Sequence, residues 1–147
     1  MDEYSEKLSP AWWMVAAVGL FVPATTLIFL PLNIWLGLGV GMALWLGSAG
    51  VLWLFAPSIS IDGHYVRAGR AAIEHTFVEK MEIFRGVEAT EQRGTKLDAR
   101  AWLVIRGWVD PVIKITISDE ADPTPYWLVS AKNPDAFVDA WKKRRSI

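Results

Sequence analysis

The sequence predicts an α+β membrane protein, in which a two-helix transmembrane hairpin precedes a small antiparallel β domain that ends in a helix. Three observations support this prediction. Residues 8–61 contain no charged side chain, a strand-like alternation of apolar and polar residues follows them, and the last residues have the spacing of an amphipathic helix. A soluble core does not need an uncharged run of that length. A bilayer does, because a spanning helix takes about 20 apolar residues to cross roughly 30 Å of hydrocarbon.

The uncharged run divides into two predicted spans, residues 10–30 and 34–55, joined by the short turn PLN. Ser9 is expected to cap the first span, with Pro10 at the first helical position, where its missing N–H has no cost. Pro57 is expected to stop the second span, because the residue before a proline is disfavoured in a helix. The sequence therefore predicts a tight transmembrane hairpin that occupies residues 10–57.

Several residues within the spans have predicted roles. Pro23 is expected to kink the first span, and Thr25 and Thr26 are expected to satisfy the backbone groups that it frees. Tryptophans are typical of the two membrane interfaces, and the predicted interface residues are Trp12, Trp13 and Trp53. Small residues let helix backbones approach closely, and those predicted to pack against a helix are Gly37, Gly41, Ala43 and Gly47, with Ser48 beside them. That helix is either the first span or one from another membrane subunit.

Residues 1–9 form a short leader that does not fit a secretory signal peptide. The leader is net acidic, the apolar run is too long, and no small-residue cleavage site precedes a polar start. Orientation follows from Lys and Arg near the span ends: the turn is uncharged, Lys7 flanks one end, and Arg67 and Arg70 follow the other. The sequence therefore predicts a multi-pass protein of the inner (plasma) membrane with both termini in the cytoplasm.

Residues 58–147 are predicted to form the cytoplasmic β domain. Asp62-Gly63 suits the positive φ angles of a type I′ hairpin turn, and the alternation around it places four apolar residues on one face: Ile59, Ile61, Val66 and Ala68. Residues 85–100 are predicted to be a charged surface loop with one helical turn before Gly94, and a loop of this length is a candidate contact region. Further strands are expected at residues 81–84, 101–106, 112–118 and 126–130.

The final helix is predicted to begin with Asn133 as its N-cap and Pro134 at the first helical position. Phe137, Val138 and Trp141 form its apolar stripe. Six or seven short antiparallel strands closed by one C-terminal amphipathic helix indicate a pleckstrin-homology-like (PH-like) roll. A different small α+β sandwich is the alternative.

The chain also resembles a family of small actinobacterial membrane proteins known as domain of unknown function 3093 (DUF3093). The resemblance rests on the stretches PAWW, DGHYVRAGRAAI, LDARAWLVIRGWV and, most specifically, DPTPYWLVSAKNPDAF. It covers nearly the whole chain and implies an integral membrane protein with two spans and a cytoplasmic β domain. It implies no established activity.

No catalytic or cofactor site is predicted. His64 and His75 are the only histidines, and with no cysteine in the chain neither has a partner at metal-ligand spacing. Phosphate-loop, dinucleotide and hydrolase motifs are absent, and the acidic turn DEAD has too few oxygen ligands for calcium. The β domain carries 14 Lys and Arg against 13 Asp and Glu, which argues against nucleic acid as a partner. We therefore expect a protein that is not an enzyme and has no cofactor.

Two non-enzymatic functions remain. In the favoured one, the protein is an accessory or assembly subunit of an inner-membrane complex, in contact with another membrane protein or a second copy of itself. In the other, its basic tail binds anionic lipid headgroups. A transport role is less favoured, because neither span contains an ionisable residue. The candidate contacts for a partner or for lipid are Arg100, Trp108, Tyr126, Trp127, Lys142, Lys143, Arg144 and Arg145.

Overall fold

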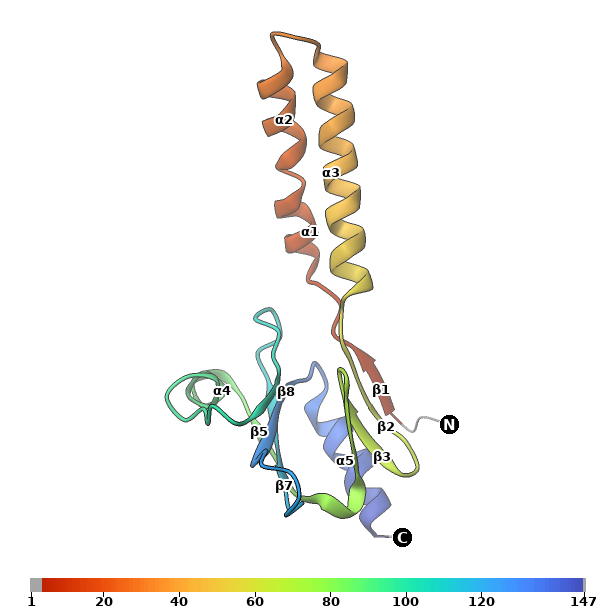
Figure 1. The fold of residues 1–147 in the computed structure, drawn as a ribbon, viewed down its shortest axis with the longest axis vertical. Coiled ribbons are helices and arrows are strands. Elements are labelled where there is room, and N and C mark those ends of the chain that lie inside the picture. Colours follow the sequence, from red (N-terminus) through yellow and green to blue (C-terminus); the bar gives the residue numbers. More distant parts are fainter. Residues whose placement is uncertain (1–3, 147) are drawn as a thin grey trace. The chain divides into compact units, whose positions relative to one another are not determined.

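The computed structural model of the protein describes residues 4–146 and divides the chain into two compact units. One unit is Ser9–Ala56, the helical hairpin. The other combines the chain before Ser9 with the chain from Pro57 onward, and we call it the β domain. Two long apolar N-terminal helical segments, two four-stranded sheets and a C-terminal helix make up the α+β fold (Figure 1).

The first apolar segment of the hairpin contains two helices, α1 (Trp12–Val18) and α2 (Phe21–Phe29). Pro23 explains the interruption between them. It has no N–H to donate to the carbonyl of Gly19, four residues earlier, and the N–H of Val22 bonds that carbonyl instead at 3.1 Å. The predicted kink is therefore confirmed, and it lies four residues before the proline. The predicted start at Pro10 is wrong, because the helix begins at Trp12 after Ala11 as N-cap.

The threonines after Pro23 satisfy different carbonyls from the one that it frees. The Thr25 hydroxyl lies 2.7 Å from the carbonyl oxygen of Phe21 and 3.1 Å from that of Gly37. The Thr26 hydroxyl donates to the carbonyl of Val22 at 2.7 Å. Thr25 therefore joins the first segment to the second.

The second segment is one helix, α3 (Ile34–Leu54). Asn33 is its N-cap, and its side-chain oxygen accepts hydrogen bonds from the main-chain N–H groups of Trp35 at 2.9 Å and Leu36 at 3.4 Å. Because this cap satisfies two of the N–H groups that a helix start leaves unpaired, the predicted turn PLN ends where the helix begins.

The first sheet of the β domain is antiparallel throughout, in the order β1 (Tyr4–Lys7), β2 (Ser58–Ile61), β3 (Tyr65–Ala68) and β4 (Ala71–Glu74). The sequence analysis did not anticipate β1, which comes from the leader and pairs along the whole of β2. The four apolar residues predicted to share a face of β2 and β3 are all fully buried.

The turn between β2 and β3 is not the predicted type I′ turn. That turn needs positive φ angles, and only Gly69 and Gly86 have them among the described residues. The Asp62 side chain holds this turn instead, since its Oδ1 accepts hydrogen bonds from the main-chain N–H groups of His64 at 2.9 Å and Tyr65 at 2.8 Å. The hydrogen bonds of the Asp62 carboxylate thus stabilise a turn that has no residue with positive φ.

The second sheet has the order β5-β7-β8-β6, with strands β5 (Val78–Phe84), β6 (Trp102–Val104), β7 (Val112–Ile117) and β8 (Tyr126–Ser130). The 3-10 helix η1 (His75–Phe77) leads into it. Strand β6 pairs with β8 in parallel, so the prediction of an entirely antiparallel domain is wrong. The reason is that β8 lies between β6 and β7, which are consecutive in the chain but do not pair.

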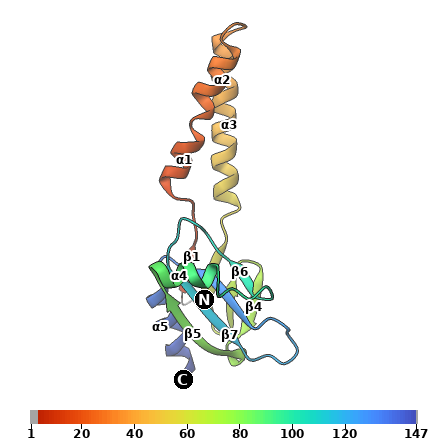
Figure 2. The same cartoon turned by 90° about the vertical axis from the view of Figure 1, so that its left-hand side faces the viewer.

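Both faces of this second sheet are covered. The main core joins one face to the first sheet and to the stripe Phe137, Val138 and Trp141 of helix α5 (Pro134–Arg145). On the other face, a second cluster contains Ala89 of helix α4 (Gly86–Arg93) with Val112, Tyr126 and Leu128. Figure 2 shows α4 in front of β5 and β7.

Helix α4 (Gly86–Arg93) corrects the prediction of a surface loop at residues 85–100, since eight of those residues form a helix with Ala89 and Gln92 buried. Most residues of α4 are polar, so its sequence lacks the apolar periodicity that predicts a helix. The two sheets and the parallel pair do not confirm a PH-like roll.

Candidate functional site

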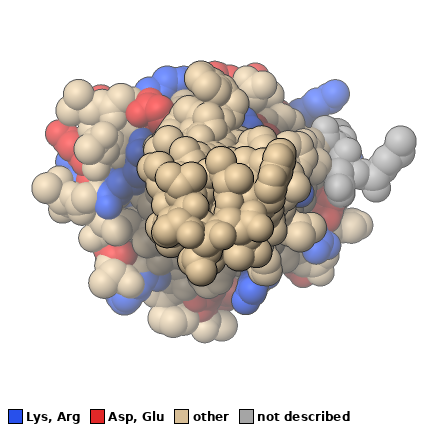
Figure 3. Space-filling view, turned by 90° about the horizontal axis from the view of Figure 1, so that it is seen from above, with Lys and Arg blue, Asp and Glu red and all other residues tan. Residues whose placement is uncertain are grey.

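The hairpin exposes a large apolar surface. The proposed interface tryptophans are 82% (Trp12), 53% (Trp13) and 57% (Trp53) exposed. The segments Trp12–Phe29 and Ile34–Leu54 are each long and apolar enough to span a membrane. In Figure 3 the hairpin faces the viewer without a charged residue. Because transfer of apolar area from water is favourable, this surface needs an apolar environment.

The small residues of α3 divide into two groups. Gly37 and Gly41 are buried against α2. A Cβ at Gly37 would lie 2.8 Å from the Thr26 Cα, and one at Gly41 would lie 2.7 Å from the Val22 Cα. These two glycines therefore pack within the hairpin, as one of the two alternatives predicted.

Ala43 and Gly47 do not belong to that close contact. They line an apolar groove of about 460 Å³ on the hairpin, and a Cβ at Gly47 would meet no atom within 4 Å. The groove lies between the first segment and the second half of α3, and its other lining residues include Val18, Phe21, Ser48 and Val51.

The two aromatic residues of β8 are not available at the surface. Tyr126 is 6% and Trp127 4% exposed, so both side chains lie in a core. The second sheet has a core on each face, and neighbouring residues of a strand point to opposite faces. The Tyr126 hydroxyl also accepts a hydrogen bond from the Asp98 N–H at 2.7 Å, which ties the segment after α4 to the sheet.

The other candidate contacts of the domain are more accessible. Arg100 is exposed and pairs with Asp98 at 2.9 Å. Hydrogen bonds from Arg100 lower the pKa of the Asp98 carboxyl to about 2. Trp108 is partly buried against the main core, with the guanidinium of Arg106 5.8 Å from its ring. The structure does not bring Arg100 and Trp108 together with the C-terminal tail into one site.

The basic tail is the last turn of α5, and its four cations have different surroundings. Lys142 and Lys143 are exposed, whereas Arg144 is partly buried. The Arg145 guanidinium donates to the main-chain oxygen of Glu79 at 2.9 Å and lies 5.4 Å from the centre of the Trp141 ring. Both arginines line a pocket in the β domain, and the two lysines do not.

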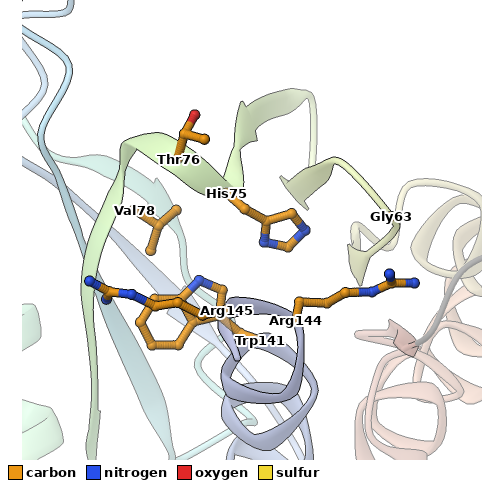
Figure 4. A pocket seen from close by; sticks show the side chains of 7 residues that line it. All are labelled: Gly63, His75, Thr76, Val78, Trp141, Arg144 and Arg145. Atoms are coloured by element: carbon orange, nitrogen blue, oxygen red, sulfur yellow. The ribbon is translucent and has the colours of Figure 1, made fainter. Parts of the chain in front are cut away.

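This pocket has a volume of about 360 Å³ and lies between the end of α5 and the segment from the β2–β3 turn to the start of β5 (Figure 4). We call it the α5 pocket. Its lining residues are Gly63, His75, Thr76, Val78, Trp141, Arg144 and Arg145. Sequence analysis missed it because its two halves are more than 60 residues apart, and Trp141 was predicted only as a core residue.

The β2–β3 turn fixes the position of His75. Its Nε2 lies 2.9 Å from the main-chain oxygen of Asp62. A carbonyl oxygen only accepts, so Nε2 carries a proton. Nδ1 is buried and has no hydrogen-bond partner within residues 4–146. The Asp62 carboxyl has its pKa lowered to about 2, chiefly by the main-chain hydrogen bonds from His64 and Tyr65, and it remains an anion at neutral pH.

Among residues 4–146, no group of three or more His, Asp or Glu side chains is placed to hold a metal ion. The apolar groove of the hairpin and the cationic, partly aromatic α5 pocket are thus two candidate sites.

Together these features define the class: an α+β protein with two N-terminal helical segments long and apolar enough to span a membrane, and a domain of two four-stranded sheets. The chain belongs to the family described as "Protein of unknown function (DUF3093)", whose family model matches residues 3–141. The resemblance noted in the sequence is therefore confirmed. Comparison with curated proteins found no match, and comparison with solved structures found none.

Proposed function

We propose that this protein is a non-enzymatic accessory subunit of a plasma-membrane complex. Its hairpin crosses the bilayer and contacts a transmembrane helix of another protein, and its β domain docks on the cytoplasmic side. One observation carries the proposal. The hairpin exposes a large apolar surface, and this surface contains an apolar groove lined by small residues.

Strand pairing supports a hairpin with both ends on one side of the membrane. Residues before the first helical segment and after the second pair as β1 and β2, and the Leu8 N–H donates to the Pro57 carbonyl at 2.9 Å. The chain therefore leaves and re-enters the β domain at one place. The Lys and Arg bias near the span ends favours the cytoplasm for that side.

The chemistry of the groove favours a helix over a lipid chain as its occupant. Ala43 and Gly47 allow a second backbone to approach closely, which is how transmembrane helices associate. Ser48 also lines the groove, and its hydroxyl has no hydrogen-bond partner within residues 4–146. An unpaired hydroxyl in hydrocarbon is costly, and a partner helix has polar groups to offer it whereas an acyl chain has none.

Binding of the tail to an anionic membrane surface is the weaker alternative. Each basic residue near such a surface contributes about 1 kcal/mol, so the three exposed cations of the tail (Lys142, Lys143 and Arg145) contribute about 3 kcal/mol where four would contribute about 4 kcal/mol. Arg145 already contacts Glu79 and Trp141 of its own domain. Those contacts favour a role for Arg145 within the domain.

The test compares two glycine variants of the full-length protein. Gly47→Leu fills the groove, while Gly39→Leu makes the same change at an exposed position outside it. A Cβ meets no atom within 4 Å at either site. After gentle detergent extraction, native-size analysis and mass spectrometry should show a stoichiometric membrane partner with the wild type and Gly39→Leu, and its loss with Gly47→Leu.

Two results would contradict the proposal. One is a lone monomer or homodimer of the wild type across several detergents. The other is equal partner recovery with Gly47→Leu and Gly39→Leu, which would show that the groove is not the contact.

A further inference from the structure

We propose that the β6 edge of the second sheet docks the β domain on the headgroup region of the bilayer. Trp102 and Leu103 are the apolar contacts, and Arg70 is the contact to anionic headgroups. This inference rests on the part of the proposed function in which the hairpin crosses the membrane. It adds a lipid contact on the β domain that is separate from both the groove of the hairpin and the C-terminal tail.

Strand β6 presents apolar side chains on both faces of a sheet edge. It is the last strand in the order β5-β7-β8-β6, and it pairs only with β8. Val104 is buried in the main core, whereas Trp102 is 40% and Leu103 44% exposed. Because neighbouring residues of a strand point to opposite faces, these two exposed side chains lie on either side of the edge. Transfer of their apolar area out of water is favourable.

Contacts within the β domain place this edge beside the point where the chain returns from the hairpin. The Trp102 Nε1 donates a hydrogen bond to the Ala68 carbonyl at 3.3 Å. A Cβ at the next residue, Gly69, would lie 3.5 Å from a Val104 methyl group and 4.0 Å from the Pro57 Cβ. Pro57 comes three residues after the last residue of α3. Because an extended chain spans roughly 3.3–3.6 Å per residue, chain length alone keeps Pro57 within about 11 Å of the end of that apolar helix.

Arg70 supplies a cation at the same corner of the domain. It follows Gly69 in the turn between β3 and β4, it is exposed, and it makes no hydrogen bond or ion pair within residues 4–146. Lys7, which is opposite Ser58 in the register of β1 and β2, is also exposed. Cations beside exposed apolar residues suit an anionic membrane surface. Tryptophan is typical of the headgroup region, where water still reaches the unpaired backbone groups of an edge strand.

The C-terminal tail belongs to the other end of strand β2. This strand begins directly after Pro57 and ends before the turn that contains Gly63. Gly63 lines the α5 pocket together with Arg144 and Arg145. Docking through the β6 edge therefore uses cations different from those of the tail, and a tail residue serves as the matched control for Arg70.

The test uses the full-length protein in vesicles of phosphatidylcholine, with and without phosphatidylglycerol. No partner protein is present, so the result does not depend on the groove. The chain has no cysteine, so one introduced cysteine carries a single NBD fluorophore. The labelled variants are Leu103→Cys at the β6 edge, Phe77→Cys at a 37% exposed apolar position of η1, and Leu46→Cys in α3. Quenching by lipids with brominated acyl chains reports contact with the bilayer, and thermal unfolding checks that each variant is folded.

We expect strong quenching of the Leu103 and Leu46 labels and little quenching of the Phe77 label. The NBD lifetimes at Leu103 give the ratio of docked to undocked β domain. In vesicles with phosphatidylglycerol, Arg70→Gln should lower this ratio about fivefold, the effect of one basic residue at an anionic surface. Lys143→Gln removes the same charge from the tail and should leave the ratio unchanged.

Three results would overturn the docking. Quenching at Leu46 with equally weak quenching at Leu103 and Phe77 overturns it alone and leaves the accessory role intact. No quenching at Leu46 overturns both, because the hairpin then does not cross the bilayer. A loss with Lys143→Gln as large as that with Arg70→Gln would assign the lipid contact to the charge of the tail.

Discussion

At the scale of single residues, Asp62 has more than one structural task. Its carboxylate holds the β2–β3 turn through two main-chain N–H groups and bonds the Arg67 side chain at 3.1 Å. Its main-chain oxygen bonds His75. One acidic residue thus shapes a turn and also places a wall of the α5 pocket.

The lowered pKa of Asp62 predicts a pH-dependent stability. The pKa is about 2 in the folded protein against an ordinary value of 3.8, so the ionised carboxylate stabilises the fold above about pH 4 and this stabilisation is lost as the pH falls toward 2. The Asp62→Asn variant has no carboxylate at this position and so lacks this stabilisation at every pH. In thermal unfolding followed by circular dichroism, the wild type should unfold at a higher temperature than Asp62→Asn at pH 5–7, and this difference should shrink between about pH 4 and 2.

The comparison with Asp62→Asn is needed because Asp98 also has a pKa of about 2 and contributes to the acid sensitivity of the wild type. A difference in unfolding temperature that stays constant down to pH 2 would show that the Asp62 charge does not stabilise the turn.

At the scale of elements, the start of α5 depends on a strand at the other end of the chain. Asn133 is the N-cap residue, as predicted, but its side chain makes no capping hydrogen bond. The Glu6 carboxylate of β1 instead accepts hydrogen bonds from the main-chain N–H groups of Lys132 at 2.6 Å and Asn133 at 3.1 Å, and from the Tyr4 hydroxyl. Burial and this carboxylate raise the pKa of Tyr4 well above its usual range.

Removal of the Glu6 carboxylate should therefore loosen two elements at once. We expect Glu6→Ala to lower the free energy of unfolding by about 1.5–3 kcal/mol, the range for hydrogen bonds to a charged group, and to speed amide hydrogen exchange in both β1 and the first turn of α5. Ser5→Ala, at the exposed neighbouring position of the same strand, is the control and should change neither. Faster exchange confined to β1 would show that Glu6 does not cap α5.

At the scale of the whole molecule, the β domain is built from two separate pieces of chain. Leu8 is fully buried in the main core, and β1 covers an edge of β2. A fragment that begins at Pro57 therefore lacks an edge strand, a core side chain and the Glu6 carboxylate. An uncovered strand edge invites pairing with other chains.

We expect residues 57–147 alone to aggregate or to unfold at a lower temperature than a version in which a Gly/Ser linker joins residues 1–8 to residue 57. About four linker residues suffice, because an extended chain spans roughly 3.3–3.6 Å per residue and Leu8 already bonds Pro57. Size-exclusion chromatography and thermal unfolding of the two fragments compare them directly. Equal stability and an equally monomeric state would mean that β1 is dispensable.

Local signals in the sequence predicted much of this fold. The absence of charge over residues 8–61 predicted both apolar segments, and period-two alternation predicted the buried faces of β2 and β3. Pro134 at the first position of α5 and its apolar stripe were also predicted correctly. Each of these signals lies within a few residues of the element that it predicts. The four stretches that resemble DUF3093 also predicted the family correctly.

The remaining features depend on pairs of segments far apart in the chain, and no local pattern encodes them. Only the tertiary structure placed β1 beside β2, β8 between β6 and β7, and α4 over the second sheet. The same is true of the α5 pocket, where His75 and the α5 arginines meet. The sequence by itself thus determined which segments are apolar, extended or helical, because those properties are local. Packing decided which segments cover one another, because burial of each apolar face requires a specific distant partner.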